Sequence, residues 1–412
     1  MVSVLRVIMV LALCGFTGCS EPGEASATPD SGHASDGSNI EDSTQPFDTA
    51  EDSIADSSPS PEARVGPAPD PNPGPEFPPE LEDDLISILA EQFEGIAAPG
   101  ATLTVVIPGY RRLETAMGKG RDEPLRDMMV GDRMRTGSVT KTFVTAATLQ
   151  LVTEGKIGLD DPIDLWVSDY SMGAGITIRR LLNHTSGIPN YTDDPNFVSK
   201  VFGHVEPQDV IDFALEMGIL FSPGDGYTYS NTGFYFLGLM LEEVTGKPVH
   251  EVLRDRFLDP YELEDTFFEG PEYPDDSYIE GYLAGAPAPL TDMSWAWAAG
   301  AIVSDGSDLC AWLEELYTGE VISEAQQSYM MTRTSLWGGS TLVDYGAGTE
   351  IHTHAGRDVF GHTGSTVGGQ CEIYLEPQSG VCVSLMTNDF FATPKPANAA
   401  LWSRVLEFVD DP

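Results

Sequence analysis

Ser138 and Lys141 are the first residues in the chain whose types and spacing suggest chemistry. They lie in the segment 137–141, Gly-Ser-Val-Thr-Lys, and residues three apart on a helix share one face. The Lys141 amine can therefore reach the Ser138 hydroxyl and act as the base that a serine nucleophile needs. The N-terminus of such a helix also favours a developing oxyanion. Because this spacing often occurs by chance, it needs support from other motifs.

Two more motifs follow in a fixed order. Tyr229-Ser230-Asn231 begins 91 residues after Ser138, and the segment 362–364, His-Thr-Gly, comes just before an expected hairpin. With the Leu-Leu-Asn-His-Thr-Ser-Gly segment at 181–187 between them, these motifs closely resemble the serine β-lactamase-like family. That family includes class C β-lactamases, D-alanyl-D-alanine carboxypeptidases and related esterases. The resemblance covers most of residues 80–412 and is weakest over 270–293.

The resemblance implies a catalytic role for each residue of the first two motifs. Ser138 would be the acylated nucleophile, and Lys141 its base, with a pKa lowered by burial and neighbouring positive charge. Tyr229 would carry the proton to the leaving group and later help to activate water. The backbone N–H groups of Ser138 and Ser365 would form the oxyanion hole.

The same resemblance implies which residues bind substrate. Asn231 would hold the substrate amide, while His362, Thr363 and Gly364 would line the opposite wall. The wall begins with histidine where β-lactamases have lysine, so its positive charge is weaker near neutral pH. This difference favours the carboxypeptidase and esterase groups over efficient β-lactam hydrolysis. We expect rates on carboxylate-bearing substrates to rise, relative to neutral esters, between pH 8 and pH 6 as His362 gains a proton.

The sequence therefore predicts a serine hydrolase that works through an acyl-enzyme, D-alanyl-D-alanine carboxypeptidase-like or esterase-like. A penicillin-binding sensor that acylates with little turnover, a class C-like β-lactamase and an inert scaffold lipoprotein remain as alternatives. The substrate would be a small molecule or a peptidoglycan peptide, and no cofactor is implied.

Several other histidines and aromatic residues have structural interpretations. His184 lies in a motif that is structural in the family, so a hydrogen-bonded packing role is expected. His352 and His354 would share one face of a strand, but no Cys or carboxylate stands at a recognisable ligand spacing, so no metal is predicted. Trp295 and Trp297 are expected to pack beneath the cleft.

The hydrophobic pattern predicts an α/β (α+β) fold, an antiparallel sheet flanked by helices with a mostly helical insert at about 155–290. The expected elements are a helix over 81–93, a strand over 102–107, a turn and long helix over 134–155, strands over 360–387 and a helix over 397–409.

The last two strands, 370–375 and 381–386, form an expected hairpin. If Leu375 pairs with Val381, Cys371 faces Leu385 and Cys382 faces Tyr374. The two sulfurs would then point to opposite faces of the sheet, and no disulfide would join them.

The N-terminal segment predicts export. Met1–Gly18 has a basic residue followed by a short apolar run, and 16–19 resembles a lipobox, so Cys19 would be lipidated. Cleavage by an ordinary signal peptidase is the alternative. Residues 19–79 are acidic and then Pro-rich, which predicts a disordered tether before a catalytic domain at 80–412. The protein would be a bacterial cell-envelope lipoprotein, in the periplasm or at the cell surface, with membrane contact only through its lipid anchor.

The overall charge narrows the range of partners. Asp and Glu total 65 against 21 Lys and Arg, which gives a formal charge of −44 over 412 residues. Such a charge repels phosphate backbones and anionic headgroups, so nucleic-acid binding and broad membrane adhesion are excluded. A hydrophobic fraction of 41% still suffices for a packed core.

Overall fold

The computed structural model describes residues 74–411, except 169–174, 273–278, 280, 290, 337–338 and 340. The expected signal peptide at 1–18, the lipidation site at Cys19 and most of the tether lie outside the described residues. Within the described ranges, no helix is both long and apolar enough to cross a membrane.

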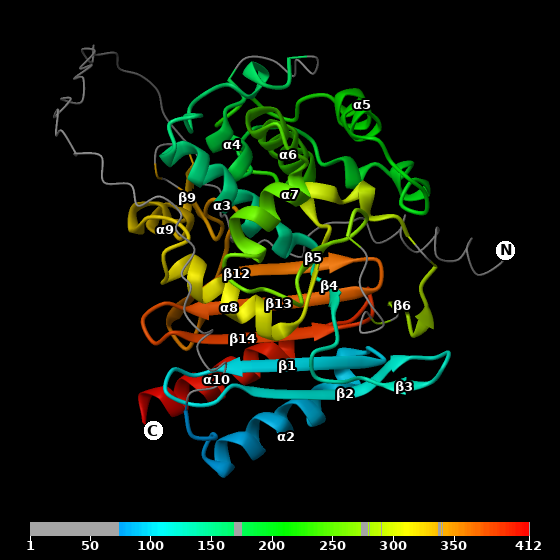
Figure 1. The fold of residues 1–412 in the computed structure, drawn as a ribbon, viewed down its shortest axis with the longest axis vertical. Helices are drawn as coiled ribbons and strands as arrows, with labels where there is room; N and C mark the ends of the chain where they lie inside the picture. Colours follow the sequence, from blue (N-terminus) through cyan, green and yellow to red (C-terminus); the bar gives the residue numbers. More distant parts are fainter. Residues whose placement is uncertain are drawn as a thin grey trace, which may run out of the picture. The chain divides into compact units, whose positions relative to one another are not determined.

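A seven-stranded antiparallel sheet forms the centre of the fold (Figure 1), in the order β11-β12-β13-β14-β1-β2-β3. Its first and last parts in the sequence meet where β1 pairs with β14. The strands are β1 (Gly100–Val106), β2 (Leu113–Arg121), β3 (Arg126–Asp127), β11 (Glu350–His354), β12 (Arg357–Thr366), β13 (Gly369–Glu376) and β14 (Val381–Thr387). The alternation of side chains along each strand sends one set to each face, so both faces need cover.

Two terminal helices cover one face of the sheet. The helices α2 (Pro79–Ile96) and α10 (Lys395–Asp410) pack together there, and their apolar residues share a core cluster with Leu103 and Leu385. Phe77 is buried in the same cluster, and the Arg111 N–H donates to the Pro75 carbonyl at 2.7 Å. The compact body therefore begins before residue 80, and the predicted tether boundary at 79 is too late.

The opposite face is covered by α8 (Gly306–Tyr317) and by a largely helical region. This region contains α3 (Thr140–Thr153), α4 (Ile178–Leu182), α5 (Pro207–Met217), α6 (Asn231–Thr245), α7 (Val249–Leu253) and α9 (Glu324–Met330). Short strands form three small sheets separate from the seven-stranded one: β4 (Met134–Arg135), β5 (Phe267–Phe268), β6 (Tyr282–Leu283), β7 (Ala286–Pro287), β8 (Ile302–Ser304), β9 (Thr334–Leu336) and β10 (Thr341–Val343). The α/β prediction with a helical insert is thus confirmed, and the insert also carries β5, β6 and β7.

The predicted hairpin exists, but its register is wrong by one residue. Leu375 pairs with Cys382 rather than with Val381, because β13 extends to Glu376 and the turn is one residue shorter than expected. Within this turn, the Gly380 N–H donates to the Glu376 carbonyl at 2.8 Å. Gly380 adopts φ 73°, a conformation that glycine takes without strain. A one-residue shift exchanges the faces of a strand.

Cys371 and Cys382 consequently point to the same face, where both lie in the core beneath α8, contrary to the prediction of opposite faces. Cys382 faces Leu375, which is four residues from Cys371 along β13, about 13 Å at the usual rise of a strand. A disulfide cannot span that separation. Both thiols are free.

Glu372, on β13, is a buried carboxyl that generates a stability prediction. Burial raises its pKa to about 7, and it accepts one hydrogen bond, from Asn398 Nδ2 at 2.8 Å. The folded state therefore holds a proton that the unfolded state releases, and stability is lost as the pH rises towards 7. Glu372→Gln stays neutral, and its amide N–H can reach Asn398 Oδ1, which has no hydrogen-bond partner among the residues that the structure describes.

We expect Glu372→Gln to stabilise the fold at pH 8 by roughly 2 kcal/mol more than at pH 5. Urea unfolding at both pH values measures this difference. Glu407→Gln, an exposed change on α10, is the matched control and should show no such dependence on pH. An equal effect of Glu372→Gln at both pH values would contradict the assignment.

Candidate active site

Ser138 lies in a single 3-10 turn, η1 (Gly137–Val139), between β4 and α3. The turn is anchored by Thr136, whose Oγ1 donates to the Ile302 carbonyl at 2.9 Å. Because α3 starts at Thr140, Lys141 lies one turn beyond the serine, with its Nζ 2.9 Å from Ser138 Oγ. The predicted contact between the two side chains is present.

Lys141 is fully buried, and burial favours the neutral amine. Burial lowers its pKa well below 10.5, and the charge of Glu350 opposes this only partly. Lys141 Nζ donates to Asn231 Oδ1 at 2.8 Å and to the Ala299 carbonyl at 2.7 Å, and both of these groups can only accept. These bonds use two N–H groups of a neutral amine, so its lone pair is left for the Ser138 hydroxyl. Lys141 is therefore arranged as a base.

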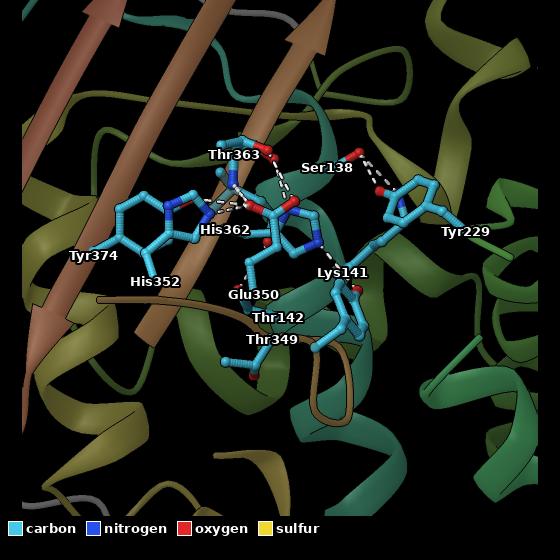
Figure 2. A network of polar contacts seen from close by, with 12 residues as sticks. Ser138, Lys141, Thr142, Tyr229, Thr349, Glu350, His352, His362, Thr363 and Tyr374 are labelled. Carbon is cyan, nitrogen blue, oxygen red and sulfur yellow. Dashed lines mark hydrogen bonds and ion pairs between the residues drawn. The ribbon is translucent and has the colours of Figure 1, made fainter. Parts of the chain in front are cut away.

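Tyr229 reaches the same oxygen from the other side. Its hydroxyl donates to Ser138 Oγ at 2.7 Å, and Lys141 Nζ lies 5.0 Å from the centre of its ring. Burial raises the pKa of Tyr229 well above 10, so the phenol keeps its proton in the resting enzyme. Ser138 is thus held between a proton donor and a proton acceptor (Figure 2).

Two glycines bring the strand β12 into backbone contact with η1. A Cβ on Gly364 would lie 1.8 Å from the Thr136 carbonyl oxygen, and one on Gly137 would lie 2.8 Å from the Ser365 nitrogen. Gly137 also has φ 53°. This contact places the backbone of Ser365 beside that of Ser138, the two residues predicted to form the oxyanion hole. Gly364 therefore acts through backbone packing, because no side chain fits there.

His362 is fully buried, and both of its ring nitrogens face protein groups. Its Nδ1 lies 2.6 Å from the Thr363 carbonyl and must carry hydrogen, so Nε2 of the neutral ring accepts from the Tyr345 hydroxyl at 3.1 Å. Burial lowers the pKa of His362 below 6.5, although Glu350 opposes the shift. Burial therefore moves the expected gain of a proton by His362 to lower pH than its residue type predicts.

Glu350, on β11, is the functional candidate that the sequence analysis missed. It is enclosed behind the third motif (Figure 2) and accepts from the Thr363 N–H and Oγ1 and from the Tyr374 hydroxyl, each at 2.9 Å. Burial opposes its ionisation, but the charge of the neighbouring histidines, where they are protonated, and the hydrogen bonds from Thr363 keep the pKa of Glu350 below 4.5. A signal was present in the sequence, because Glu350, His352 and His354 alternate and so share one face.

The two histidines that follow Glu350 have structural contacts. His352 Nε2 lies 3.2 Å from the Tyr374 hydroxyl, and the His354 ring stacks on Trp402 with centroids 5.7 Å apart. In the part of the chain that the structure describes, no group of three or more His, Cys, Asp or Glu side chains could hold a metal ion.

His184 has the packing role that the sequence predicts. It is buried, its Nδ1 accepts from the Ser230 N–H at 3.2 Å, and its ring lies 4.4 Å from that of Tyr229. Trp295 is buried, and the Trp297 ring packs on Tyr235 with centroids 5.1 Å apart.

Asn231 is oriented by residues that no motif indicated. The Asn231 N–H donates to Asn190 Oδ1 at 3.1 Å, and its Nδ2 donates to Thr192 Oγ1 at 3.3 Å. Since its Oδ1 accepts from Lys141, this side chain positions the base as well as bordering the site.

The family model described as Beta-lactamase matches residues 86–406. The chain belongs to the beta-lactamase family of serine hydrolases. Its relatives include penicillin-binding protein 4* of Bacillus subtilis (strain 168), with 28% identity over 54% of this chain and 53% of that protein. The D-alanyl-D-alanine-carboxypeptidase/endopeptidase AmpH of Escherichia coli (strain K12) is 24% identical over 61% of this chain and 66% of its own length. The chain thus spans about half to two thirds of these curated relatives.

The similarity to solved structures extends over nearly the whole of their own chains. A D-amino acid amidase from Ochrobactrum anthropi SV3 has a TM-score of 0.70 and 26% identity, covering 81% of this chain and 99% of that one. A D-stereospecific amidohydrolase from Streptomyces sp. has a TM-score of 0.66 and 28% identity, covering 77% and 96%.

The contact between β12 and η1 generates a prediction about Gly364. A methyl group on Gly364 must displace the Thr136 carbonyl, which separates Ser365 from Ser138. We expect Gly364→Ala to lower kcat/KM on a chromogenic ester by about 100-fold or more, the usual scale for loss of an oxyanion donor. Gly95→Ala adds the same methyl group where nothing lies within 4 Å, and should leave kcat/KM unchanged. Wild-type kcat/KM in a folded Gly364→Ala protein would show that this contact does not form the hole.

Proposed function

We propose that the protein is an exported serine hydrolase that cleaves amide, peptide or ester bonds in small D-amino-acid compounds or peptidoglycan peptides. The observation that carries this proposal is the hydrogen bonding of Lys141, since Asn231 and Ala299 occupy two of its N–H groups and leave its lone pair for Ser138. A lysine with only a packing role would not need its amine within hydrogen-bond distance of Ser138 Oγ.

Acylation would proceed by transfer of the Ser138 proton to the Lys141 amine as Oγ attacks the substrate carbonyl. The carbonyl oxygen becomes an oxyanion beside the N–H groups of Ser138 and Ser365. Tyr229, hydrogen-bonded to Oγ at 2.7 Å, is placed to give its proton to the leaving group and to regain one from the Lys141 ammonium. Water then takes the place of the leaving group and attacks the acyl carbonyl. Its proton passes to Lys141, and Ser138 Oγ receives a proton from the same groups as the ester bond breaks.

Amide and peptide bonds are favoured over β-lactams by the neutral wall of the site. His362 stands where β-lactamases carry a lysine, and its burial keeps the ring neutral. The likeness to proteins named as a D-amino acid amidase and a D-alanyl-D-alanine-carboxypeptidase/endopeptidase supports the same choice. Esters remain good test substrates because they need less assistance to their leaving group.

The location of the protein is part of the proposal. The sequence of residues 1–19 supports export and lipidation at Cys19, and the composition of the tether supports a body held away from a bacterial envelope membrane. Globomycin treatment of expressing cells tests this, because it should cause the unprocessed precursor to accumulate. Cys19→Ala should prevent labelling with a palmitate analogue.

The nucleophile can be tested by intact mass. We expect incubation with a p-nitrophenyl ester, and separately with a fluorescent penicillin, to add one acyl group to the protein at Ser138. Ser138→Ala should remove the adduct and the esterase activity. Ser365→Ala removes an exposed hydroxyl but leaves the backbone N–H in place, so it should retain both. An adduct that persists in Ser138→Ala would overturn the mechanism.

The same ester distinguishes a hydrolase from a penicillin-binding sensor. A hydrolase releases p-nitrophenol over many turnovers after any initial burst. Release that stops after one equivalent would identify a sensor instead.

A further inference from the structure

Thr363 lies on β12 between His362 and Gly364 and is half-buried, whereas both of its neighbours are buried. It is therefore the side chain through which the His-Thr-Gly wall can present a polar atom to substrate. Both of its hydrogen-bearing groups point to one partner: the N–H donates to Glu350 Oε2 and the hydroxyl to Glu350 Oε1, each at 2.9 Å. A threonine hydroxyl has a single hydrogen, so this one is already used.

Glu350 can only accept in this arrangement. An ionised carboxylate has no hydrogen to donate. Its oxygens receive the two hydrogens of Thr363 and that of the Tyr374 hydroxyl, and His362 Nδ1 lies 3.5 Å away. With donors on both oxygens, protonation of Glu350 would break one of these bonds. The hydroxyl hydrogen of Thr363 is thus held inward.

We propose that Thr363 is an acceptor-only specificity residue, held so by Glu350 as its positioning residue, and that the wall selects substrates that present an N–H or ammonium group over those that present a carboxylate. This inference deepens the proposed function and rests on it. None of the described residues donates a hydrogen bond to Thr363 Oγ1, so its lone pairs are available to accept from a substrate. A substrate carboxylate would meet these lone pairs with the negative charge of Glu350 directly behind them, which is repulsive.

The charges around the wall support the same selection. His362 is neutral, with both nitrogens engaged by protein, and offers no cation to a carboxylate. Lys141 Nζ is hydrogen-bonded to Ser138, Asn231 and Ala299, so it is not available to bind a substrate carboxylate. A substrate ammonium or carboxamide would instead find an acceptor on the wall and a buried negative charge near it.

The matched pair N-acetyl-D-alanyl-D-alaninamide and N-acetyl-D-alanyl-D-alanine tests this proposal, because the two differ only in presenting a carboxamide or a carboxylate. We expect the wild-type kcat/KM to favour the carboxamide by about tenfold or more, the effect of one hydrogen bond gained against one repelled charge. Equal rates, or a preference for the carboxylate, would overturn the proposal.

Glu350→Gln should reverse the direction of the Thr363 hydroxyl. The position of Oε2 receives two donors, from Thr363 and Tyr374, so the glutamine oxygen must take it. The amide NH2 then faces Thr363 Oγ1 and donates to it, which turns the hydroxyl hydrogen towards substrate. We expect the carboxamide-to-carboxylate ratio to fall at least tenfold. General damage would lower both rates equally, and an unchanged ratio in an active variant would contradict the inference.

Three controls keep the test independent of folding and of the proposed chemistry. Glu242→Gln neutralises a half-buried carboxyl on α6, where it accepts a hydrogen bond from the Val249 N–H, and should keep the wild-type ratio. Thr363→Ser keeps the hydroxyl and should keep the wild-type carboxamide-to-carboxylate ratio. Thr363→Val removes the hydroxyl and should abolish the preference for the carboxamide, which tests the proposal even if Glu350→Gln fails to fold. Thermal shifts of Ser138→Ala with the two peptides should rank them in the same order, so a failure of catalysis is distinguishable from a failure of this inference.

Discussion

Full burial of the Lys141 amine is the constraint on which the rest of the site depends. An ammonium deprived of water is costly, so burial favours the neutral form, which alone can take a proton from Ser138. The amine still needs acceptors for its hydrogens, and these come from Asn231 at the start of α6 and Ala299 at the end of η7 (Trp297–Ala299). Three elements remote in sequence, α3, α6 and η7, must therefore meet around one nitrogen.

The sequence predicts what depends on local spacing and misses what depends on strand pairing. The contact between Ser138 and Lys141 follows from a helix that begins at Thr140, so the motif predicts it. Glu350 reaches Thr363 only because β11 pairs with β12, with Glu350 opposite Gly361, and no spacing in the sequence reveals that register. The one-residue error in the β13–β14 hairpin has the same origin, since a turn one residue shorter than expected shifted every pair.

The state of His362 could not be predicted from its residue type either. A histidine near its reference pKa titrates around neutral pH, and the motif gives no reason to expect otherwise. The Tyr345 hydroxyl and the Thr363 carbonyl enclose the ring and fix its tautomer, and burial then outweighs the nearby carboxylate. His362, which stands where β-lactamases have a lysine, is thus a structural part of the wall and does not supply a weaker positive charge in the same place.

The polarity of the substrate wall follows from this replacement. A lysine ammonium beside Glu350 would neutralise the carboxylate and donate hydrogen bonds outward. With a neutral His362, the negative charge of Glu350 is balanced mainly by hydrogen bonds from Thr363 and Tyr374, and those bonds withdraw hydrogens from the wall. The wall therefore changes from a donor to an acceptor surface although its backbone position is kept by the contact of Gly364 with Thr136. In this way one fold can retain its nucleophile and oxyanion hole while it selects a different group in the substrate. The selection is changed by the buried carboxylate of Glu350, which acts through Thr363 and need not touch the substrate.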